Sequence, residues 1–243
     1  MISWNIYIKK DIAQAAKKAD KERAQSDPAF VSATFDMQSV LQLPSGAESL
    51  LYCKRKLIIH NRTIYEATAP NKGYCYLWPK NAGKRGSVEI GPVLFEYIRG
   101  LPESVRHLSL FSDSCTSQNR NQIISATLLH AVQSLTVIEI IDQIFLVPGR
   151  TQMECDSMHS SIEHAQKHMK IYTVNDWENV MRGARRHNPY ITQDVKYRDF
   201  YDLKQLARTT ITNTRKTEKR KICQLVGHTL SEIPQEFPTS DLL

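Results

Sequence analysis

The spacing of apolar residues changes part-way along the chain, and this change constrains the fold more than any other feature. The first half holds three segments rich in β-branched and aromatic residues, joined by short polar loops and typical of an antiparallel meander: residues 31–43, 56–68 and 73–79. In the second half, helical and strand-like spacings alternate: helices at 87–100, 119–135, 156–169 and 173–186, strands at 107–113 and 136–149. We therefore expect an α/β protein.

The order of these segments, β-β-β-α-β-α-β-α, predicts a particular sheet. A three-stranded meander followed by right-handed α/β crossovers is the layout of a ribonuclease-H-like fold, with a mixed five-stranded sheet and flanking helices. In that layout the first and fourth strands run side by side. We expect three parts: a charged N-terminal helix in residues 1–28, the ribonuclease-H-like domain in residues 29–203, and a basic extension in residues 204–243.

The positive charge of the chain is concentrated near its C-terminus. The formal net charge is +7, and residues 204–221 hold seven Lys or Arg against one Glu, so this segment alone carries +6. Such a segment is either a solvated tail or an arm that binds phosphate groups. The second interpretation makes DNA the expected partner, contacted by Arg215, Lys216, Lys219, Arg220 and Lys221.

The cysteines and the apolar runs exclude several classes of protein. Five scattered cysteines without C-x-x-C spacing argue against a zinc or redox motif, and their odd number suits a reducing, intracellular compartment. No signal peptide opens the chain. No apolar run approaches the ~18–20 residues of a membrane span, so we expect no membrane partner.

Two aspartates stand at unusual positions in the predicted strands. Asp36 lies inside the first strand, where Asp is disfavoured, and Asp113 ends the fourth. Because these strands are expected to be neighbours, both carboxylates should point toward one edge of the sheet. Converging carboxylates repel one another unless they hold cations, so we expect two Mg²⁺ or Mn²⁺ ions there, suited to phosphodiester chemistry. The alternative is that Asp113 is a plain turn residue.

The helix expected at residues 156–169 offers a third carboxylate. Asp156, His159 and Glu163 follow one another at i, i+3 and i+7, on one side of the helix. Glu163 falls about 130° from the centre of the apolar stripe and has a Lys four residues later, so we expect it to be solvated. Asp156 is therefore preferred, with Glu163 as the alternative catalytic residue and an N-cap as the competing role of Asp156. The expected metal ligands are Asp36, Asp113 and Asp156.

Polar groups beside these carboxylates are candidates for DNA contacts. Gln118, Asn119 and Arg120 stand where the next helix begins, a natural place to meet a phosphate, although Asn119 is also a plausible N-cap. His159 lies at the border of the apolar stripe, where the wall of a cleft would be. Glu89, on the first crossover helix, is a further candidate carboxylate, with an ordinary exposed residue as the favoured alternative.

Four blocks of the sequence occur in a characteristic order: TFDMQSVLQLP, RGSVEI, SDSCTSQNRN and PGRTQMECDSMHSSIE. As a set they resemble a transposon-derived family of DDE-transposase-like proteins with a ribonuclease-H-like domain, from about residue 30 to residue 200. The resemblance implies DNA strand cleavage and transfer in the nucleus, dependent on Mg²⁺ or Mn²⁺. Its acidic residues would be Asp36, Asp113 and either Asp156 or Glu163.

The chain departs from the pattern of this family at three places. These are the loop residues Ser114, Thr116 and Ser117, the pair Gly149-Arg150 where the family tends to have Gly-His, and the pair Pro79-Lys80 after a tryptophan. Two classes of function therefore stay open. One is a transposase or nuclease catalytic domain, and the other is a non-enzymatic nucleic-acid- or protein-binding derivative, a decayed or domesticated copy. A homo-oligomer is compatible with both.

Overall fold

The structure is a computed structural model that describes residues 2–46, 55–146 and 153–210. This part of the chain is an α/β protein with six α-helices and a mixed sheet of seven strands. The helices are α1 (Ile2–Ser26), α3 (Ser87–Arg99), α4 (Gln122–Ser134), α5 (Glu154–Gln166), α6 (Val174–Gly183), α7 (Leu203–Thr210) and the short 3-10 helix η1 (Tyr197–Asp199). The strands are β1 (Phe30–Met37), β2 (Leu41–Leu43), β3 (Leu57–Glu66), β4 (Gly73–Pro79), β5 (His107–Asp113), β6 (Ile140–Leu146) and β7 (Ile191–Asp194).

The strands lie in the order β6-β5-β1-β3-β4-β7, and β2 pairs with β3. β1, β3 and β4 are antiparallel neighbours, whereas β5 runs parallel to β1, β6 parallel to β5, and β7 parallel to β4. The expected α/β class, the mixed sheet, the antiparallel meander and the side-by-side course of β1 and β5 are therefore confirmed.

The expected number of five strands is wrong, for two reasons. The segment expected to form one strand, residues 31–43, forms two strands, β1 and β2, which both pair with β3. Met37 pairs with Arg62 and Leu41 with Ile59, so the first segment has one more residue between these pairs than β3 has. This extra residue interrupts the pairing with β3. The other addition is β7, whose four residues carry no strand pattern of their own and are held by parallel pairing with β4.

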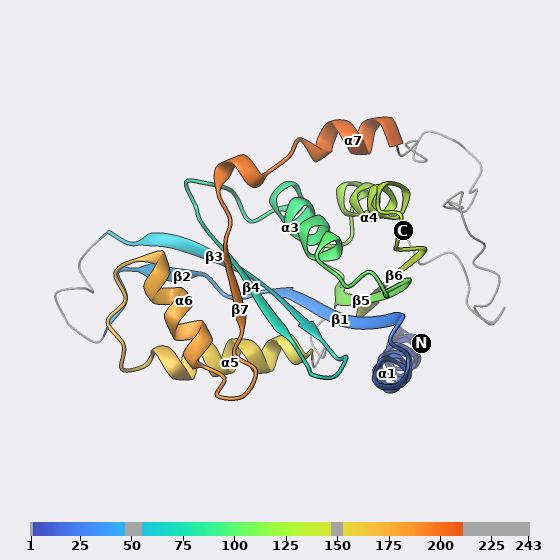
Figure 1. The fold of residues 1–243 in the computed structure, drawn as a ribbon, viewed down its shortest axis with the longest axis horizontal. Helices are drawn as coiled ribbons and strands as arrows, with labels where there is room; N and C mark the ends of the chain where they lie inside the picture. Colours follow the sequence, from blue (N-terminus) through green and yellow to red (C-terminus); the bar gives the residue numbers. More distant parts are fainter. Residues whose placement is uncertain (1, 47–54, 147–152, 211–243) are drawn as a thin grey trace.

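The helices form a layer on each face of the sheet (Figure 1). α3, α4 and α7 cover one face, while α5 and α6 cover the other, with α1 on this second side beneath β1. Side chains alternate along β1: Ala33 and Phe35 join the core under α3 and α4, whereas Thr34 lies 3.6 Å from the sulfur of Cys155 in α5. Asp36, two residues after Thr34, therefore belongs to the face that α5 covers.

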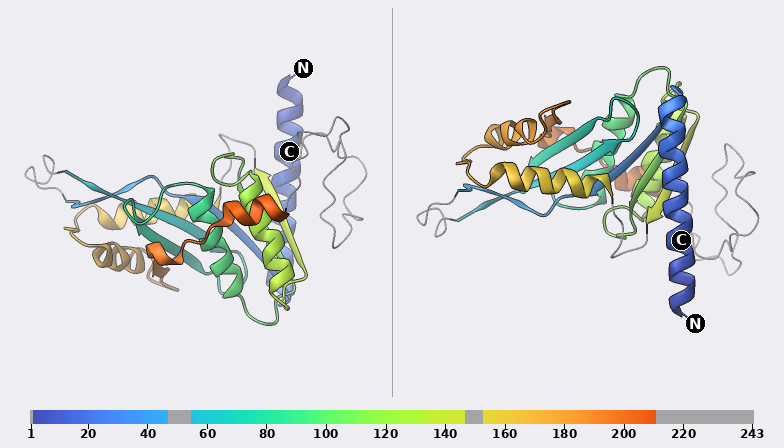
Figure 2. Two further views of the ribbon diagram at one scale, coloured as in Figure 1. Left: turned by 90° about the horizontal axis from the view of Figure 1, so that it is seen from above. Right: turned by 90° about the horizontal axis from the view of Figure 1, so that it is seen from below.

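The two terminal helices pack against the domain. The N-terminal helix is observed as expected, and its far end projects beyond the sheet (Figure 2). Its Lys17 forms an ion pair of 2.8 Å with Glu154 of α5. At the other end, the boundary expected between residues 203 and 204 falls inside α7, whose Leu203 and Ala207 are buried. No helix in the described ranges is long and apolar enough to cross a membrane.

Candidate metal centre

Two of the candidate carboxylates lie at the same end of the sheet. β1 and β5 are parallel, with Thr34 paired with Phe111. Asp36 and Asp113 each lie two residues beyond this last printed pair, so the same spacing brings them to the same end of the sheet, and both side chains are half-buried. The two aspartates thus share the edge at which the parallel strands end.

The first turns of α5 add Asp156 and His159 to this edge. One ligand atom each of Asp36, Asp156 and His159 lie within 4.8 Å of one another. Mg²⁺ lies about 2.0–2.1 Å from its ligands, so small side-chain movements would let one ion contact all three residues. His159 was expected to contact DNA, whereas here it joins two carboxylates. We call these three residues the Asp36–Asp156–His159 trio; Asp113 is not part of it, although its charge acts on Asp36.

A threonine on β3 orients His159. The Thr63 hydroxyl donates to the carbonyl oxygen of Asp36 at 3.2 Å and lies 2.8 Å from Nε2 of His159. If the one hydroxyl hydrogen is donated to Asp36, the Thr63 oxygen accepts the Nε2–H of His159. Nδ1 then carries the lone pair of the ring and is the nitrogen that can bind a metal ion.

Burial and charge together shape the protonation of Asp36 and His159. Burial raises the pKa of Asp36, as do the charges of Asp113 and Asp156, whereas Arg62 and the backbone N–H of Met37 lower it. Burial lowers the pKa of His159 to about 4, against the opposing effect of Asp156. His159 is therefore neutral at pH 7, which is the form that binds metals. A divalent cation would offset both the burial and the repulsion at Asp36.

Acidification should destabilise the metal-free fold through His159. Its pKa of about 4 in the folded chain lies below the ordinary value of 6.5. The neutral form therefore contributes its full stability above pH 6.5 and loses it as the pH falls toward 4. Urea unfolding in EDTA at pH 7 and pH 5 should show a loss of roughly 1–2 kcal/mol that is absent from His159→Gln. Equal losses in the two proteins would contradict the burial of a neutral imidazole.

Asp113 is held by a buried amide. Its Oδ1 accepts hydrogen bonds from the backbone N–H of Cys115 at 3.3 Å and from Nδ2 of Asn119. Asn119 is fully buried and its Oδ1 accepts from Nη2 of Arg62 at 2.9 Å. Both ends of the Asn119 amide are thus used inside the protein, and its predicted N-cap role is wrong. The N-cap of α4 is Asn121, whose Oδ1 accepts from the N–H groups of residues 123 and 124.

Arg62 is the part of the site that sequence patterns did not predict. Its side chain is 1% exposed and lies over the ring of Phe35 at 4.4 Å. Burial lowers its pKa to about 10, so it keeps its charge at neutral pH, and Nη1 is buried without a hydrogen-bond partner among the described residues. The sequence offered one indication of this role, an Arg inside an apolar strand segment. It did not show that the side chain is buried, because the burial depends on contacts with β1 and with the loop before α4.

The remaining carboxylate candidates lie apart from the trio. Glu163 is exposed, and its Oε1 lies 3.5 Å from the hydroxyl of Ser39 rather than in an ion pair with Lys167. Glu89 accepts a hydrogen bond from the backbone N–H of Lys84 at 3.0 Å, so it anchors a loop.

Asp156 is not the N-cap of α5 but lies in its first turn, where it accepts from the N–H of Met153 at 2.9 Å.

The other predicted DNA contacts are placed only in part. Gln118 and Arg120 are half-buried in the loop after β5, and the guanidinium of Arg120 lies 5.7 Å from the ring centre of Phe145. The basic group Arg215, Lys216, Lys219, Arg220 and Lys221 lies outside the described residues.

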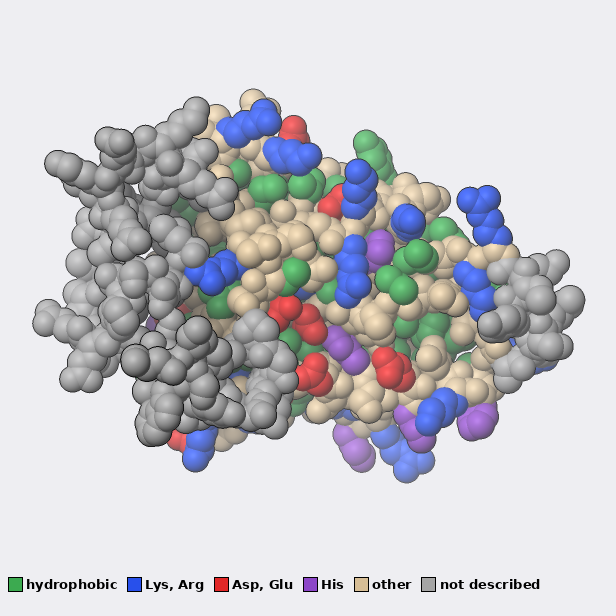
Figure 3. Space-filling model, turned by 180° about the vertical axis from the view of Figure 1, so that it is seen from behind, with side chains coloured by type: hydrophobic (Ala, Val, Ile, Leu, Met, Phe, Trp, Pro, Cys, Tyr) green, Lys and Arg blue, Asp and Glu red, His purple; other side chains and the backbone are tan. Residues whose placement is uncertain are grey.

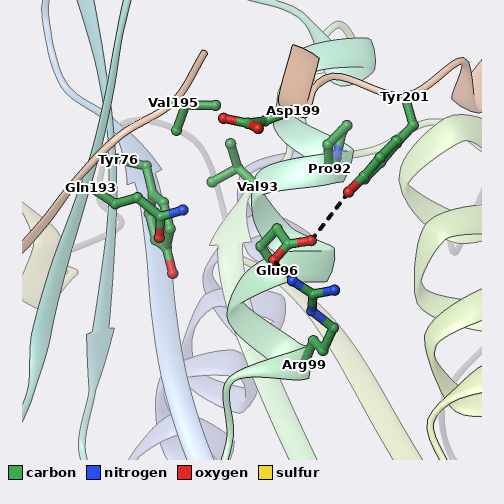
Figure 4. Close-up of a pocket in the computed structure, with 9 residues that line it drawn as sticks. All are labelled: Tyr76, Pro92, Val93, Glu96, Arg99, Gln193, Val195, Asp199 and Tyr201. Atoms are coloured by element: carbon green, nitrogen blue, oxygen red, sulfur yellow. Dashed lines mark hydrogen bonds and ion pairs between the residues drawn. The ribbon is translucent and has the colours of Figure 1, made fainter. Parts of the chain in front are cut away.

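The trio belongs to the α5 face of the molecule. On the face drawn in Figure 3, Asp, Glu and His side chains gather near the middle, with Lys and Arg side chains beside them. A separate hollow of about 250 Å³ lies between α3 and the segment of β7 and η1 (Figure 4). Its Glu96 pairs with Arg99 at 2.5 Å and accepts from the hydroxyl of Tyr201 at 3.4 Å. Because α3 covers the opposite face of the sheet, this hollow is not part of the metal centre.

Fold and site together define an α/β protein with a mixed sheet and an acidic–histidine cluster at the end of its central parallel strands. The chain belongs to the family of the domain of unknown function DUF7869, which matches residues 92–233, more than half of the sequence. The matched region contains Asp113, Asp156 and His159 and begins after Asp36. No curated protein and no solved structure shows a significant match.

Proposed function

We propose that this protein is a divalent-metal-dependent enzyme that cleaves and transfers DNA strands, a DDE-transposase-like catalytic domain with a ribonuclease-H-like fold, acting in the nucleus. The order β6-β5-β1-β3-β4, with β3 antiparallel to its neighbours, supports the proposed layout. The observation that carries the proposal is the grouping of Asp36, Asp156 and His159 within 4.8 Å, with Asp113 at the end of the neighbouring parallel strand and close enough to raise the pKa of Asp36.

Each residue of the centre has a distinct role in this proposal. Asp36, Asp156 and Nδ1 of His159 would hold one ion, and Asp113 with Asp36 would face a second. Bound ions would activate a water or a DNA 3′-hydroxyl and stabilise the leaving oxygen. Thr63 keeps His159 in the tautomer that can bind, while Asn119 fixes the direction of the Asp113 carboxylate.

The nitrogen ligand bears on the choice of metal. Mg²⁺ prefers oxygen ligands, whereas imidazole suits later first-row metals, and Mn²⁺ accepts both. We therefore propose Mn²⁺ as the better activator, with Mg²⁺ as the weaker one. The direct test incubates the protein with supercoiled and linear DNA in Mn²⁺, in Mg²⁺ and in EDTA, and measures nicks and joined products. DNA binding without cleavage in either metal would favour the non-enzymatic derivative.

Two substitutions on α5 separate the candidate third carboxylates. Asp156→Asn should abolish cleavage, because it removes a charge from the trio while an amide oxygen can still accept from the N–H of Met153. Glu163→Gln should leave cleavage nearly intact, because that side chain is exposed and outside the trio. Initial rates of nicking in Mn²⁺ measure both variants. Loss of activity in Glu163→Gln alone would move the third-ligand role to Glu163.

A further inference from the structure

A basic loop lies beside the metal centre and holds one arginine in a fixed position. The loop spans residues 80–86, between β4 and α3, and carries the exposed side chains of Lys80, Lys84 and Arg85. Nη2 of Arg85 donates to the carbonyl oxygens of Met37 at 3.1 Å and of Gln38 at 3.0 Å. Met37 directly follows Asp36. The two carbonyls lie between β1 and β2, where the pairing of this segment with β3 is interrupted. The guanidinium of Arg85 is thus tied to the backbone next to a predicted metal ligand.

The loop itself is fastened on several sides. Nε1 of the buried Trp78 donates to the carbonyl oxygen of Lys84 at 3.0 Å, and the N–H of Lys84 donates to Glu89 at 3.0 Å. The N–H of Ser87 donates to the carbonyl of Ser117, in the loop that follows Asp113, at 3.1 Å. The arginine and both edge aspartates therefore share one framework, so a group bound by Arg85 would be positioned relative to the carboxylates.

Only part of the hydrogen-bonding capacity of Arg85 is used. Both carbonyls are bound by one nitrogen, and neither Nε nor Nη1 makes a hydrogen bond to any residue in the described ranges. A guanidinium offers five N–H donors in a planar arrangement that matches two oxygens of a phosphate. An acidic centre repels a polyanion, so a cationic group beside it is needed to bring a phosphodiester within reach.

We propose that Arg85 binds a backbone phosphate of the nucleic-acid strand next to the phosphodiester that reacts, with Lys80 and Lys84 extending the contact along the strand. This inference rests on the proposed function, because it assigns the substrate side of the same centre. It makes Arg85 a substrate-binding residue, distinct from the metal ligands.

The test measures DNA affinity without metal. Fluorescence anisotropy with a labelled oligonucleotide in EDTA, at several salt concentrations, gives Kd and its salt slope for each variant. Arg85→Gln should weaken binding about tenfold and flatten the slope by about one contact, and Arg85→Lys should restore most of the slope but less of the affinity. The matched control is Arg106→Gln: Arg106 is also exposed and donates to a carbonyl, that of Val137 at 3.0 Å, but precedes β5 at the other end of the sheet. It should bind like the wild type.

A second measurement separates the two proposals. Arg85→Gln should keep the Mn²⁺-dependent rise in melting temperature of the wild type, since it removes no metal ligand. If Arg85→Gln and Arg106→Gln bind DNA equally, or if the wild type binds no DNA, Arg85 only caps the two carbonyls and the inference is overturned. A wild type that binds DNA through Arg85 but shows neither a Mn²⁺ shift nor cleavage would instead overturn the proposed function.

Discussion

Replacing Asp36 by Asn should abolish DNA cleavage and remove most of the stabilisation that Mn²⁺ gives to the fold. Binding of an ion to the native state alone stabilises it by about 2.7 kcal/mol at a hundredfold excess over Kd, which for a domain of this size is a rise of roughly 5–10 °C in Tm. Without metal the effect should have the opposite sign. Burial, Asp113 and Asp156 all raise the pKa of Asp36, so a neutral amide there relieves both burial and repulsion.

Thermal melts of wild type and Asp36→Asn, each in EDTA and in Mn²⁺, test this expectation. The variant should melt at an equal or higher temperature than the wild type in EDTA and at a lower one in Mn²⁺. Glu163→Gln is the matched control, because it removes an exposed carboxylate on the same side of α5 and should keep the full rise. A wild type whose Tm does not respond to Mn²⁺ or Mg²⁺ would remove the main support for a metal centre.

Replacing Asn119 by Ala should cost about 3–5 kcal/mol of unfolding free energy. The change removes the acceptor of the hydrogen bond that the buried guanidinium of Arg62 donates to Oδ1 of Asn119, and a buried charged donor left without its acceptor is strongly destabilising. It also removes the amide that donates to Asp113. Asn121→Ala provides the comparison, because the loss of an ordinary N-cap costs about 0.5–2 kcal/mol.

A double-mutant cycle isolates the part due to the buried charge. Arg62→Met combined with Asn119→Leu replaces the pair by apolar groups and should recover much of the stability that Asn119→Ala loses. Urea unfolding of the single and double variants gives the coupling free energy. If Asn119→Ala costs no more than Asn121→Ala, Arg62 does not depend on this amide.

The sequence by itself determined the elements of the central sheet and the position of its two edge aspartates. Apolar alternation and helical spacing are local signals, so β3, β4, β5 and the helices between the later strands could be predicted within a few residues of their ends, whereas β1 was predicted as one strand with β2. The predicted layout placed β1 and β5 side by side, as they are, and this brings Asp36 and Asp113 to one edge. The apolar stripe of α5 likewise indicated that Glu163 faces solvent.

Tertiary structure alone decided which groups complete the site. Whether His159 meets carboxylates or solvent depends on how α5 is placed over β1 and β3, and that placement is set by packing across the sheet. Arg62 and Asn119 meet only because a strand and a loop 57 residues apart are brought together. Tertiary contacts also decided β7 and the packing of α7. Both segments are too short to be stable alone, and they depend on pairing with β4 and on burial against the domain, respectively.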